Sequence, residues 1–439
     1  MNKTFIMHSF GCKVNQEEGS GMAALLAAHG WQEAAPNTEA LLYIVNACTV
    51  TQTADKKARA LIRRLRREHP QALLAVTGCY AQVAAEQIAA LKAADIIAGL
   101  NERAALPALV EQYLSDKRPL TLVSDITKAA NFAPIGPPQR QKRARAYLKV
   151  EDGCGQFCHY CIIPLARGPV RSLPLNKALA IAQELIRAGH RELVLSGIHI
   201  GAYGEDLGSG QDLPSLIENI LLLPGDFRLR LGSIEPRQFS AGLLRLYAAE
   251  QRICPHLHIP LQSGSDAVLN AMNRDYRVAD YAALLKKVRT LRPGCAITTD
   301  ILTGYPGEMA TDFAATMDFC EQMAFARLHV FPYSKRPGTV AATLPQQIPQ
   351  KEKERRAMLL GELATTLAAA YARSYIGAKL EYLYEQEIML EGQSYYSGHS
   401  DNYLPLLLPA AGPPPAGLTI TQALEYCEGY LLCEALHQR

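Results

Sequence analysis

Three cysteines lie close together in the stretch GCGQFCHYC, residues 153–161. Their spacing, C-x3-C-x2-C, offers three thiols where a tetrahedral metal ion needs four ligands. A structural zinc site is one interpretation, but His159 would be a cramped fourth ligand and no second cysteine pair is nearby. A 4Fe–4S cluster held by three thiolates leaves one iron free to bind a small molecule. We therefore expect Cys154, Cys158 and Cys161 to hold a catalytic cluster.

A second set of cysteines is spread along the first hundred residues. Cys12, Cys48 and Cys79 each follow a predicted strand, in FGC, NAC and TGC. The carboxyl ends of parallel strands meet at one edge of a sheet, so three loops there can bring three thiols together. Buried cysteine also serves as a small hydrophobic residue, and this alternative stays open. We expect only structural roles for the remaining cysteines, which are Cys254, Cys295, Cys320, Cys427 and Cys433.

The elements that position the second set follow from the apolar runs. Short buried runs alternate with amphipathic helical patterns, the clearest of which is residues 55–69 with apolar residues at i, i+3, i+4 and i+7. Such alternation predicts an α/β region with a parallel sheet covered by helices on both faces. Its strands are expected at residues 4–8, 41–46, 73–77 and 95–98.

A second alternating series follows a proline-rich stretch, residues 117–146, that we interpret as a linker. Six strand–helix units are too few for a closed eight-stranded barrel and favour an open, partial one. A long helix is expected at 349–374, and the remaining residues predict a small all-β domain. The six strands are expected at 147–151, 192–196, 227–231, 256–260, 296–302 and 327–332.

Glycine-rich segments follow three of these strands. They read SGIHIGAYGED (196–206), LQSGSD (261–266) and TGYPGE (303–308). Glycine after a strand lets the backbone approach a ligand closely, although each segment alone could be a simple turn. Together they surround the same barrel end as the three-cysteine loop, which predicts a ligand site there.

Charge is balanced overall but uneven along the chain. The net charge of the 439 residues is +3, so global charge predicts no anionic partner. Two local runs are basic: residues 56–67 hold seven cations and no acid, and residues 139–149 hold five. Both favour contacts with RNA phosphates, although a solvated helix face and a flexible linker are the competing interpretations. With sparse cysteines, no cleavable leader and no long apolar run, we expect a cytoplasmic protein.

The residues resemble a known family. The three-cysteine motif, with Tyr160 before its last cysteine, resembles the radical S-adenosylmethionine signature. With Cys12, Cys48 and Cys79 added, the chain is similar to the methylthiotransferases over about residues 3–437. Six local segments resemble the MtaB-type branch: GCKVN, NACTVT, VTGCYAQ, CIIPLARG, HIPLQSGS and HVFPYSKRPGT. This implies a flavodoxin-like methylthiotransferase domain with an auxiliary cluster, a linker, a radical S-adenosylmethionine partial barrel and a TRAM-like domain, at 1–116, 117–146, 147–374 and 375–439.

The resemblance also implies the chemistry. The cluster at Cys154, Cys158 and Cys161 would chelate S-adenosylmethionine, whose reductive cleavage gives a 5′-deoxyadenosyl radical. A second 4Fe–4S cluster, open at one iron, would supply sulfur, and a second S-adenosylmethionine the methyl group. The substrate would be carbon 2 of N6-threonylcarbamoyladenosine at position 37, in a tRNA anticodon stem-loop. An electron donor protein such as flavodoxin or ferredoxin and a sulfur source are implied partners, with no membrane.

The residues that contact S-adenosylmethionine are less clear from the sequence. Tyr160, Glu235 and Gln262 are candidates, and ordinary polar residues of the barrel mouth are the competing explanation. The unstacked base must be brought to the radical, as expected for chemistry on a loop base.

One departure concerns the TRAM-like domain. Residues 379–438 hold one lysine, no arginine and eight acidic residues, so their affinity for phosphate should be poor. They would either stack RNA bases on Tyr395, Tyr396 and Tyr403 or serve mainly in packing. Alternative functions are modification of isopentenyladenosine in tRNA or of a ribosomal protein aspartate. A non-catalytic iron–sulfur sensor that binds RNA is a further alternative.

Overall fold

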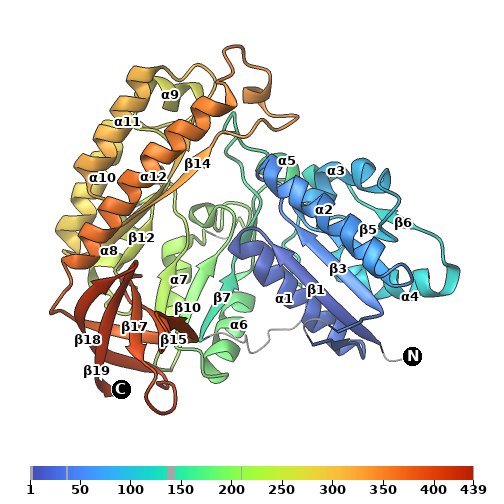
Figure 1. Cartoon of the computed structure of the whole chain (residues 1–439), viewed down its shortest axis with the longest axis horizontal. Helices are drawn as coiled ribbons and strands as arrows, with labels where there is room; N and C mark the ends of the chain where they lie inside the picture. The colour runs from blue at the N-terminus through green and yellow to red at the C-terminus, as the bar shows by residue number, and fades with distance from the viewer. Residues whose placement is uncertain (1–2, 36–37, 136–143, 209, 439) are drawn as a thin grey trace.

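The computed structural model describes residues 3–35, 38–135, 144–208 and 210–438. They form an N-terminal sheet flanked by helices, a central series of parallel strands and helices, and a C-terminal region of mainly antiparallel strands. In Figure 1 the N-terminal sheet lies to one side, and the C-terminal strands lie at one end of the central region. None of the described helices is both long and apolar enough to cross a membrane.

The N-terminal sheet has six parallel strands in the order β2-β1-β3-β4-β5-β6. Every residue of β3 and β4 is buried, because helices cover both faces of the sheet. Helices α2 and α3 pack on one face, and α1 and α4 on the other. The bounds are β1 Thr4–Phe10, α1 Lys13–Ala28, β3 Leu42–Ala47, α2 Gln52–Glu68, β4 Leu73–Thr77, α3 Cys79–Ala89, β5 Ile96–Ala98 and α4 Leu106–Asp116.

Both outer strands of this sheet are short and were not predicted. They are β2, Gln32–Glu33, and β6, Leu120–Leu122. The first part of the expected linker is therefore structured, since β6 pairs with β5 and a 3-10 turn follows at Ile126–Lys128. Three residues are too few to show an alternating pattern. Residues 136–143 of the expected linker lie outside the described residues.

The central region contains six parallel strands in two three-stranded sheets, ordered β7-β10-β11 and β12-β13-β14. Isolated bridges from Leu229 to Ile253 and from Ser233 to His258 join the two sheets, so the strands follow one another in chain order. The strands are β7 Arg145–Lys149, β10 Glu192–Ser196, β11 Arg228–Leu231, β12 His256–His258, β13 Ala296–Thr303 and β14 Arg327–Pro332. The main helices are α6 Leu175–Arg187, α7 Leu213–Leu221, α8 Ala241–Ala249, α10 Val278–Leu291, α11 Ala310–Met323 and α12 Gln350–Arg373.

The two faces of these six strands differ in chemistry. Side chains alternate along a strand, and one alternate set, with Leu193, Leu229 and Ile297, packs with the helices in one large apolar core. The opposite set points away from the helices and is strongly polar. It includes Arg145, Lys149, Glu192, Arg228, Arg230, His256, His258, Thr298, Asp300, Arg327 and His329. We call this set the inner face of the central strands.

The C-terminal region is a closed barrel with the strand order β15-β16-β17-β19-β18. Its core includes Tyr382, Leu406 and Leu431, each fully buried. The strands are β15 Lys379–Leu390, β16 Gln393–Ser400, β17 Pro405–Pro409, β18 Leu418–Cys427 and β19 Tyr430–Gln438. The predicted α/β class with parallel sheets and a β-rich C-terminal region is thus confirmed.

The C-terminal region packs against the starts of the central strands through ion pairs. Arg145 pairs with Glu385 at 2.5 Å, and Arg228 pairs with Glu381 at 3.1 Å.

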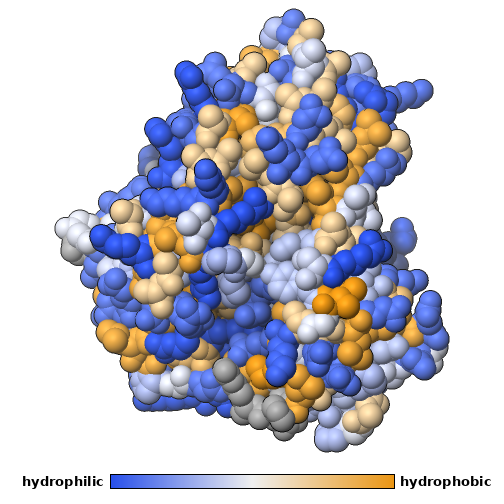
Figure 2. Space-filling model, turned by 90° about the vertical axis from the view of Figure 1, so that its left-hand side faces the viewer, coloured by the Kyte–Doolittle hydropathy of each residue, from blue (hydrophilic) through white to orange (hydrophobic). Residues whose placement is uncertain are grey.

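On the face that Figure 2 shows, hydrophobic residues are interspersed with hydrophilic ones. That face therefore presents scattered apolar side chains, which are normal for a protein surface.

Replacing Ile44 tests the packing of the N-terminal sheet. Ile44 is fully buried in β3, so Ile44→Ala should lower the free energy of unfolding by about 2–5 kcal/mol. Leu222→Ala is the control, because Leu222 is 82% exposed and should change stability by less than about 0.5 kcal/mol. Urea denaturation followed by circular dichroism measures both, and equal effects would contradict the assignment of β3 to the core.

Candidate active site

The three-cysteine loop of residues 153–161 is held tightly by backbone contacts. Gly153 has a φ of +90°, and a Cβ there would lie 1.9 Å from the Pro169 carbonyl oxygen, so only glycine fits. The Cys154 amide donates to the Gly168 carbonyl at 3.0 Å. At the other end of the loop the His159 amide donates to the Met272 carbonyl at 3.0 Å. The loop thus has one defined path above the strands.

The thiols of this loop are partly buried and contact a cationic group. Arg274 donates from Nη1 to Cys158 Sγ at 3.2 Å, and its Nη2 pairs closely with Glu235. Burial raises the pKa of both Cys154 and Cys161 to about 12. A guanidinium beside a thiolate offsets part of that cost, so the site suits thiolates that are bound to a metal cluster.

Side chains from neighbouring strand ends complete the surroundings of Cys154. His199 Nδ1 lies 3.9 Å from Cys154 Sγ, and the His199 amide donates to Glu151 Oε2 at 2.6 Å. Burial raises the pKa of Glu151 to about 8, and its Oε1 has no hydrogen-bond partner among the described residues. A buried oxygen without a partner fits a site that receives a polar ligand.

The three expected S-adenosylmethionine contacts have different environments. Glu235 is tied to the loop through Arg274, as described above. Gln262 follows β12 with a φ of +70°, and such strain in a non-glycine residue is typical of ligand sites. Tyr160 packs beside the small apolar cluster around Met272 and Tyr305. Contact of these three residues with S-adenosylmethionine stays a prediction.

The second cysteine set lies at the ends of three adjacent strands, as predicted. Cys12 caps α1 after β1, Cys48 follows β3, and Cys79 begins α3 after β4. A Cβ on Gly11 would lie 2.4 Å from the Cβ of Cys48, so the loop after β1 runs directly against Cys48. The thiols influence one another: burial raises the pKa of Cys79 to about 12, and the charges of Cys48 and Cys12 act in the same direction.

A fully buried guanidinium joins the two cysteine sets. Arg167 ends α5, Ile163–Arg167, and donates from Nε to Cys79 Sγ at 3.2 Å. The next residue, Gly168, accepts the hydrogen bond from Cys154 described above. Arg167 thus contacts Cys79 of the second set, and the adjacent residue Gly168 contacts Cys154 of the three-cysteine loop.

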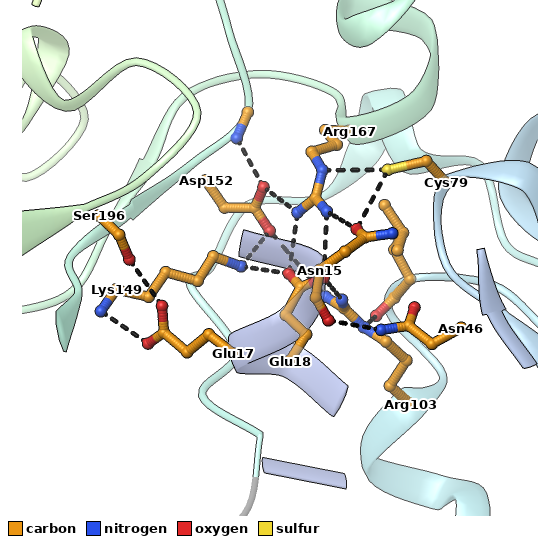
Figure 3. A network of polar contacts seen from close by, with 12 residues as sticks. Asn15, Glu17, Glu18, Asn46, Cys79, Arg103, Lys149, Asp152, Arg167 and Ser196 are labelled. Atoms are coloured by element: carbon orange, nitrogen blue, oxygen red, sulfur yellow. Dashed lines mark hydrogen bonds and ion pairs between the residues drawn. The ribbon is translucent and has the colours of Figure 1, made fainter. Parts of the chain in front are cut away.

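Carboxylates from two regions neutralise Arg167 (Figure 3). Its Nη1 lies 2.8 Å from Glu18 on α1 and 2.9 Å from Asp152, which is in the short strand β8, Glu151–Asp152. Lys149 and Arg103 pair with the same two carboxylates. These cations hold the pKa values of Glu18 and Asp152 well below their usual range, although burial acts in the opposite direction. The network links α1 to the central strands.

A second arginine makes a similar connection beside Cys48. Arg336 lies in the loop after β14 and pairs with Asp55 of α2 at 2.7 Å. It also donates to Thr49 Oγ1 at 2.7 Å, one residue beyond Cys48. Two central-region arginines thus reach the loops that hold two of the three N-terminal cysteines.

The arrangement does not suit a single metal ion. No three Cys, His, Asp or Glu side chains in the described part of the chain converge as ligands of one ion. The His159 ring hydrogen-bonds to the Ala271 carbonyl through Nδ1 at 2.9 Å, which orients the ring beside the loop. Thiolates of an iron–sulfur cluster each bind a different iron, so they need not converge on one point. Both cysteine sets could therefore hold a cluster.

The two basic runs have different environments. Lys56, Lys57 and Arg63 of α2 are exposed. A hollow of about 350 Å³ beside this helix is also lined by Ile162, next to Cys161. An exposed basic helix that leads to the cysteine loop suits an RNA substrate.

The linker run does not provide such a surface. Lys149 and Arg145 are buried in ion pairs with Glu18 and Glu385, so they cannot bind phosphate. The preceding cations, up to residue 143, lie outside the described residues. The prediction of RNA contacts by this run is wrong for Arg145 and Lys149, because their charges are already neutralised.

The proposed aromatic contacts of the C-terminal region are also mostly engaged. Tyr396 is buried. The Tyr403 ring stacks on His399 and packs at a tilt against His256, with ring centroids 4.8 Å apart in each case. Stacking of RNA bases on these two rings is therefore not supported, and packing is the use that the contacts show.

Comparison with known proteins agrees with this geometry. The sequence model of the Radical SAM superfamily matches residues 148–320, and that of the Uncharacterized protein family UPF0004 matches residues 4–99. The chain is 38% identical to the threonylcarbamoyladenosine tRNA methylthiotransferase MtaB of Bacillus subtilis, over 91% of this chain and 89% of that protein. It is 36% identical to the protein of that name from Thermotoga maritima, over 92% and 90%. The chain belongs to the methylthiotransferase family of radical S-adenosylmethionine enzymes.

Other relatives differ in substrate or in sequence. The tRNA-2-methylthio-N(6)-dimethylallyladenosine synthase of Sphingopyxis alaskensis is 34% identical, over 89% of this chain and 88% of that protein. Among solved structures, the radical S-adenosylmethionine methyltransferase TsrM from Kitasatospora setae is similar with a TM-score of 0.56. It covers 78% of this chain and 75% of its own at 13% identity, so this likeness concerns the fold alone.

Several residues of the site were not predicted from the sequence. Arg167, Arg274 and Arg336 contact or approach the cysteines, and His199 lies beside Cys154. The available signal was a charged residue between apolar residues and glycine, as in IIPLARG around Arg167. A charge in such a context is either exposed or buried with partners, and only the structure identifies the partners.

Replacing Arg167 tests the buried network. Arg167→Met leaves Glu18 and Asp152 buried with one fewer counterion, so the free energy of unfolding should fall by about 3–5 kcal/mol. Arg237→Met is the matched control, because Arg237 is 59% exposed in a surface pair and should change stability by less than about 1 kcal/mol. Urea unfolding of the cluster-free proteins measures both. A loss below about 1 kcal/mol for Arg167→Met would contradict the network's role.

Proposed function

We propose that the protein is a tRNA methylthiotransferase that adds sulfur and a methyl group at carbon 2 of N6-threonylcarbamoyladenosine, next to the anticodon. Two cysteine triads, connected through Arg167 and Gly168, are the observation that carries this proposal. One triad would suffice for radical chemistry, whereas sulfur insertion needs a sulfur donor beside it. The names of the relatives from Bacillus subtilis and Thermotoga maritima support the same substrate.

In this proposal Cys154, Cys158 and Cys161 hold one 4Fe–4S cluster, and Cys12, Cys48 and Cys79 hold the other. The first cluster would supply the electron for reductive cleavage of S-adenosylmethionine. The second would provide sulfur, and a second S-adenosylmethionine the methyl group. An electron donor protein and a sulfur source complete the set of partners.

The chain's own residues would orient and shield these groups. Arg274 hydrogen-bonds Cys158 and holds Glu235 in place, so Glu235 can meet the polar end of S-adenosylmethionine. Glu151, whose Oε1 has no partner among the described residues, follows β7, and Gln262 follows β12. The tight backbone path around Gly153 would shield one side of the cluster from water.

We further propose a division into functional parts. The N-terminal sheet to residue 116 would be a flavodoxin-like domain that carries the auxiliary cluster, and residues 147–374 a partial barrel that carries out the radical reaction. The closed barrel after residue 375 would be a TRAM-like domain with mainly a packing role. The polar inner face of the central strands favours a polar adenosine substituent over an isopentenyl group, which would need an apolar lining.

Analysis of tRNA tests the activity. Nucleosides from cells that lack this protein should contain N6-threonylcarbamoyladenosine without its methylthio group, as measured by mass spectrometry. The wild-type gene should restore the group, whereas Cys154→Ala and Cys79→Ala should not. Cys427→Ala is the control, since Cys427 belongs to neither triad. Anaerobically purified wild-type protein should contain about eight irons, and each triad variant about four. Retention of the methylthio group in the deleted strain would refute the proposal.

The basic helix generates a separate expectation. Lys56→Ala, Lys57→Ala and Arg63→Ala together should weaken tRNA binding and reduce the slope of log K against log salt by about 2–3. The control is the triple variant Lys286→Ala, Lys287→Ala and Arg245→Ala, which removes exposed cations from helices on the opposite side of the central strands. Fluorescence anisotropy at several salt concentrations measures both. Equal slopes in all three proteins would place the RNA elsewhere.

A further inference from the structure

Two cations near the inner face of the central strands have no ion-pair partner among the residues that the structure describes. Arg145, Lys149, Arg228 and Arg230 are all paired with carboxylates. By contrast, Lys13 and Arg327 are exposed, and neither forms an ion pair with a residue that the structure describes. Positive charge without a counterion beside a polar interior is typical of a site for an anion.

Lys13 lies where the N-terminal sheet meets the central and C-terminal regions. It is the first residue of α1 and directly follows Cys12. Its Nζ lies 5.5 Å from the centre of the Tyr403 ring, which comes from the C-terminal region. The side chain therefore extends from a cysteine of the second triad towards the inner face.

Arg327 approaches the same place from β14. Arg327, Thr298 and Tyr403 line one hollow of about 350 Å³ between the central strands and the C-terminal region. Thr298 accepts or donates a hydrogen bond with His258 Nδ1 at 2.9 Å. Tyr403 is thus the common neighbour of both unpaired cations, and its φ of +70° shows that its backbone is held in a strained conformation.

His329 lies two residues beyond Arg327 on the same face of β14. Its ring packs edge-on against His258, with centroids 5.7 Å apart. Burial lowers the pKa of His329 to about 4, and the charges of His258, Arg327 and Lys13 act in the same direction. His329 is therefore neutral near pH 7 and can donate a hydrogen bond without adding charge. Asp300, the nearest carboxylate, is already engaged by His258 at 3.3 Å.

The substrate of the proposed function supplies a matching anion. The threonylcarbamoyl substituent on N6 ends in a carboxylate. In adenine, carbon 2 and carbon 6, which carries N6, flank N1 on one edge of the ring. A base whose carbon 2 faces the sulfur donor therefore places its N6 substituent nearby. Lys13 follows a cysteine of the proposed donor site, so its ammonium lies on the side where that substituent must be.

We propose that Lys13, Arg327 and His329 form the subsite that receives the carboxylate of the threonylcarbamoyl group. The inference rests on the proposed function and identifies the residues that select this substrate. An isopentenyl substituent has no group to pair with these cations and would leave them desolvated without a partner. The subsite thus discriminates by charge and not by size.

Binding of three matched RNAs to the cluster-loaded full-length protein tests the subsite. The RNAs are anticodon stem-loops with N6-threonylcarbamoyladenosine, with its methyl ester, or with plain adenosine. The wild-type protein should bind the acid about tenfold or more tightly than the ester, because a charge-assisted contact is lost in the ester. Equal affinity for acid and ester would overturn the proposal without any variant.

Variants then assign the discrimination to residues. Arg327→Gln and, separately, Lys13→Gln should each reduce the acid-to-ester ratio towards one while leaving the affinity for the ester unchanged. Arg245→Gln is the control, since Arg245 is exposed on α8 outside the apolar core. If Arg327→Gln lowered the affinity for all three RNAs by the same factor, Arg327 would bind a backbone phosphate. The carboxylate assignment would then be wrong.

The same RNAs separate this inference from the proposed function. With S-adenosylmethionine and a reductant, the wild-type protein should convert the acid-bearing RNA to its methylthio product, detected by mass spectrometry. Absence of that product would refute the proposed function itself. Formation of the product without discrimination between acid and ester would refute the subsite alone.

Discussion

The structure depends on one buried positive charge, the guanidinium of Arg167. A charge removed from water is tolerated only when partners surround it. Its partners come from both halves of the molecule, with Glu18 on α1 and Asp152 beside the cysteine loop. Without the central region, Glu18 would lose its partners Arg167 and Lys149. Without the N-terminal region, these two cations would lose Glu18. Ion pairs across this junction, together with a small apolar cluster that includes Cys79 and Ala166, therefore place the N-terminal sheet against the central strands.

This constraint has a chemical use. Sulfur insertion requires that the radical, the reacting carbon and the sulfur donor be positioned to within a fraction of an ångström. Arg167 and Arg336 reach the loops of Cys79 and Cys48 from the two ends of the central strand series. Glycines at positions 11 and 153 permit backbone approaches that no side chain would allow. Rigid ion pairs and tight loops together replace the flexibility expected between two separate parts.

Burial decided which features could be predicted from the sequence. Strands β4, β10 and β14 were predicted with their observed bounds, because β4 and β10 are buried throughout and the apolar residues Leu328 and Val330 alternate with polar ones in β14. The meeting of Cys12, Cys48 and Cys79 followed from the rule that parallel strand ends share one edge. The three residues of β6 are too few to show an alternating apolar pattern, so this strand was not predicted. Lys149 and Arg145 pair with Glu18 and Glu385, which lie 131 and 240 positions away along the chain. The sequence around each cation therefore gave no indication of its partner.

The acidity of the C-terminal region has a consequence for how such proteins can evolve. Glu381 and Glu385 are counterions of arginines at the starts of the central strands. Tyr403, from the same region, covers Arg230 and Arg145 with its ring. A barrel of the same shape taken from a relative would fit only if it brought carboxylates to the same two places. The last five strands are therefore not an exchangeable module, and their composition has become matched to the strands they cover.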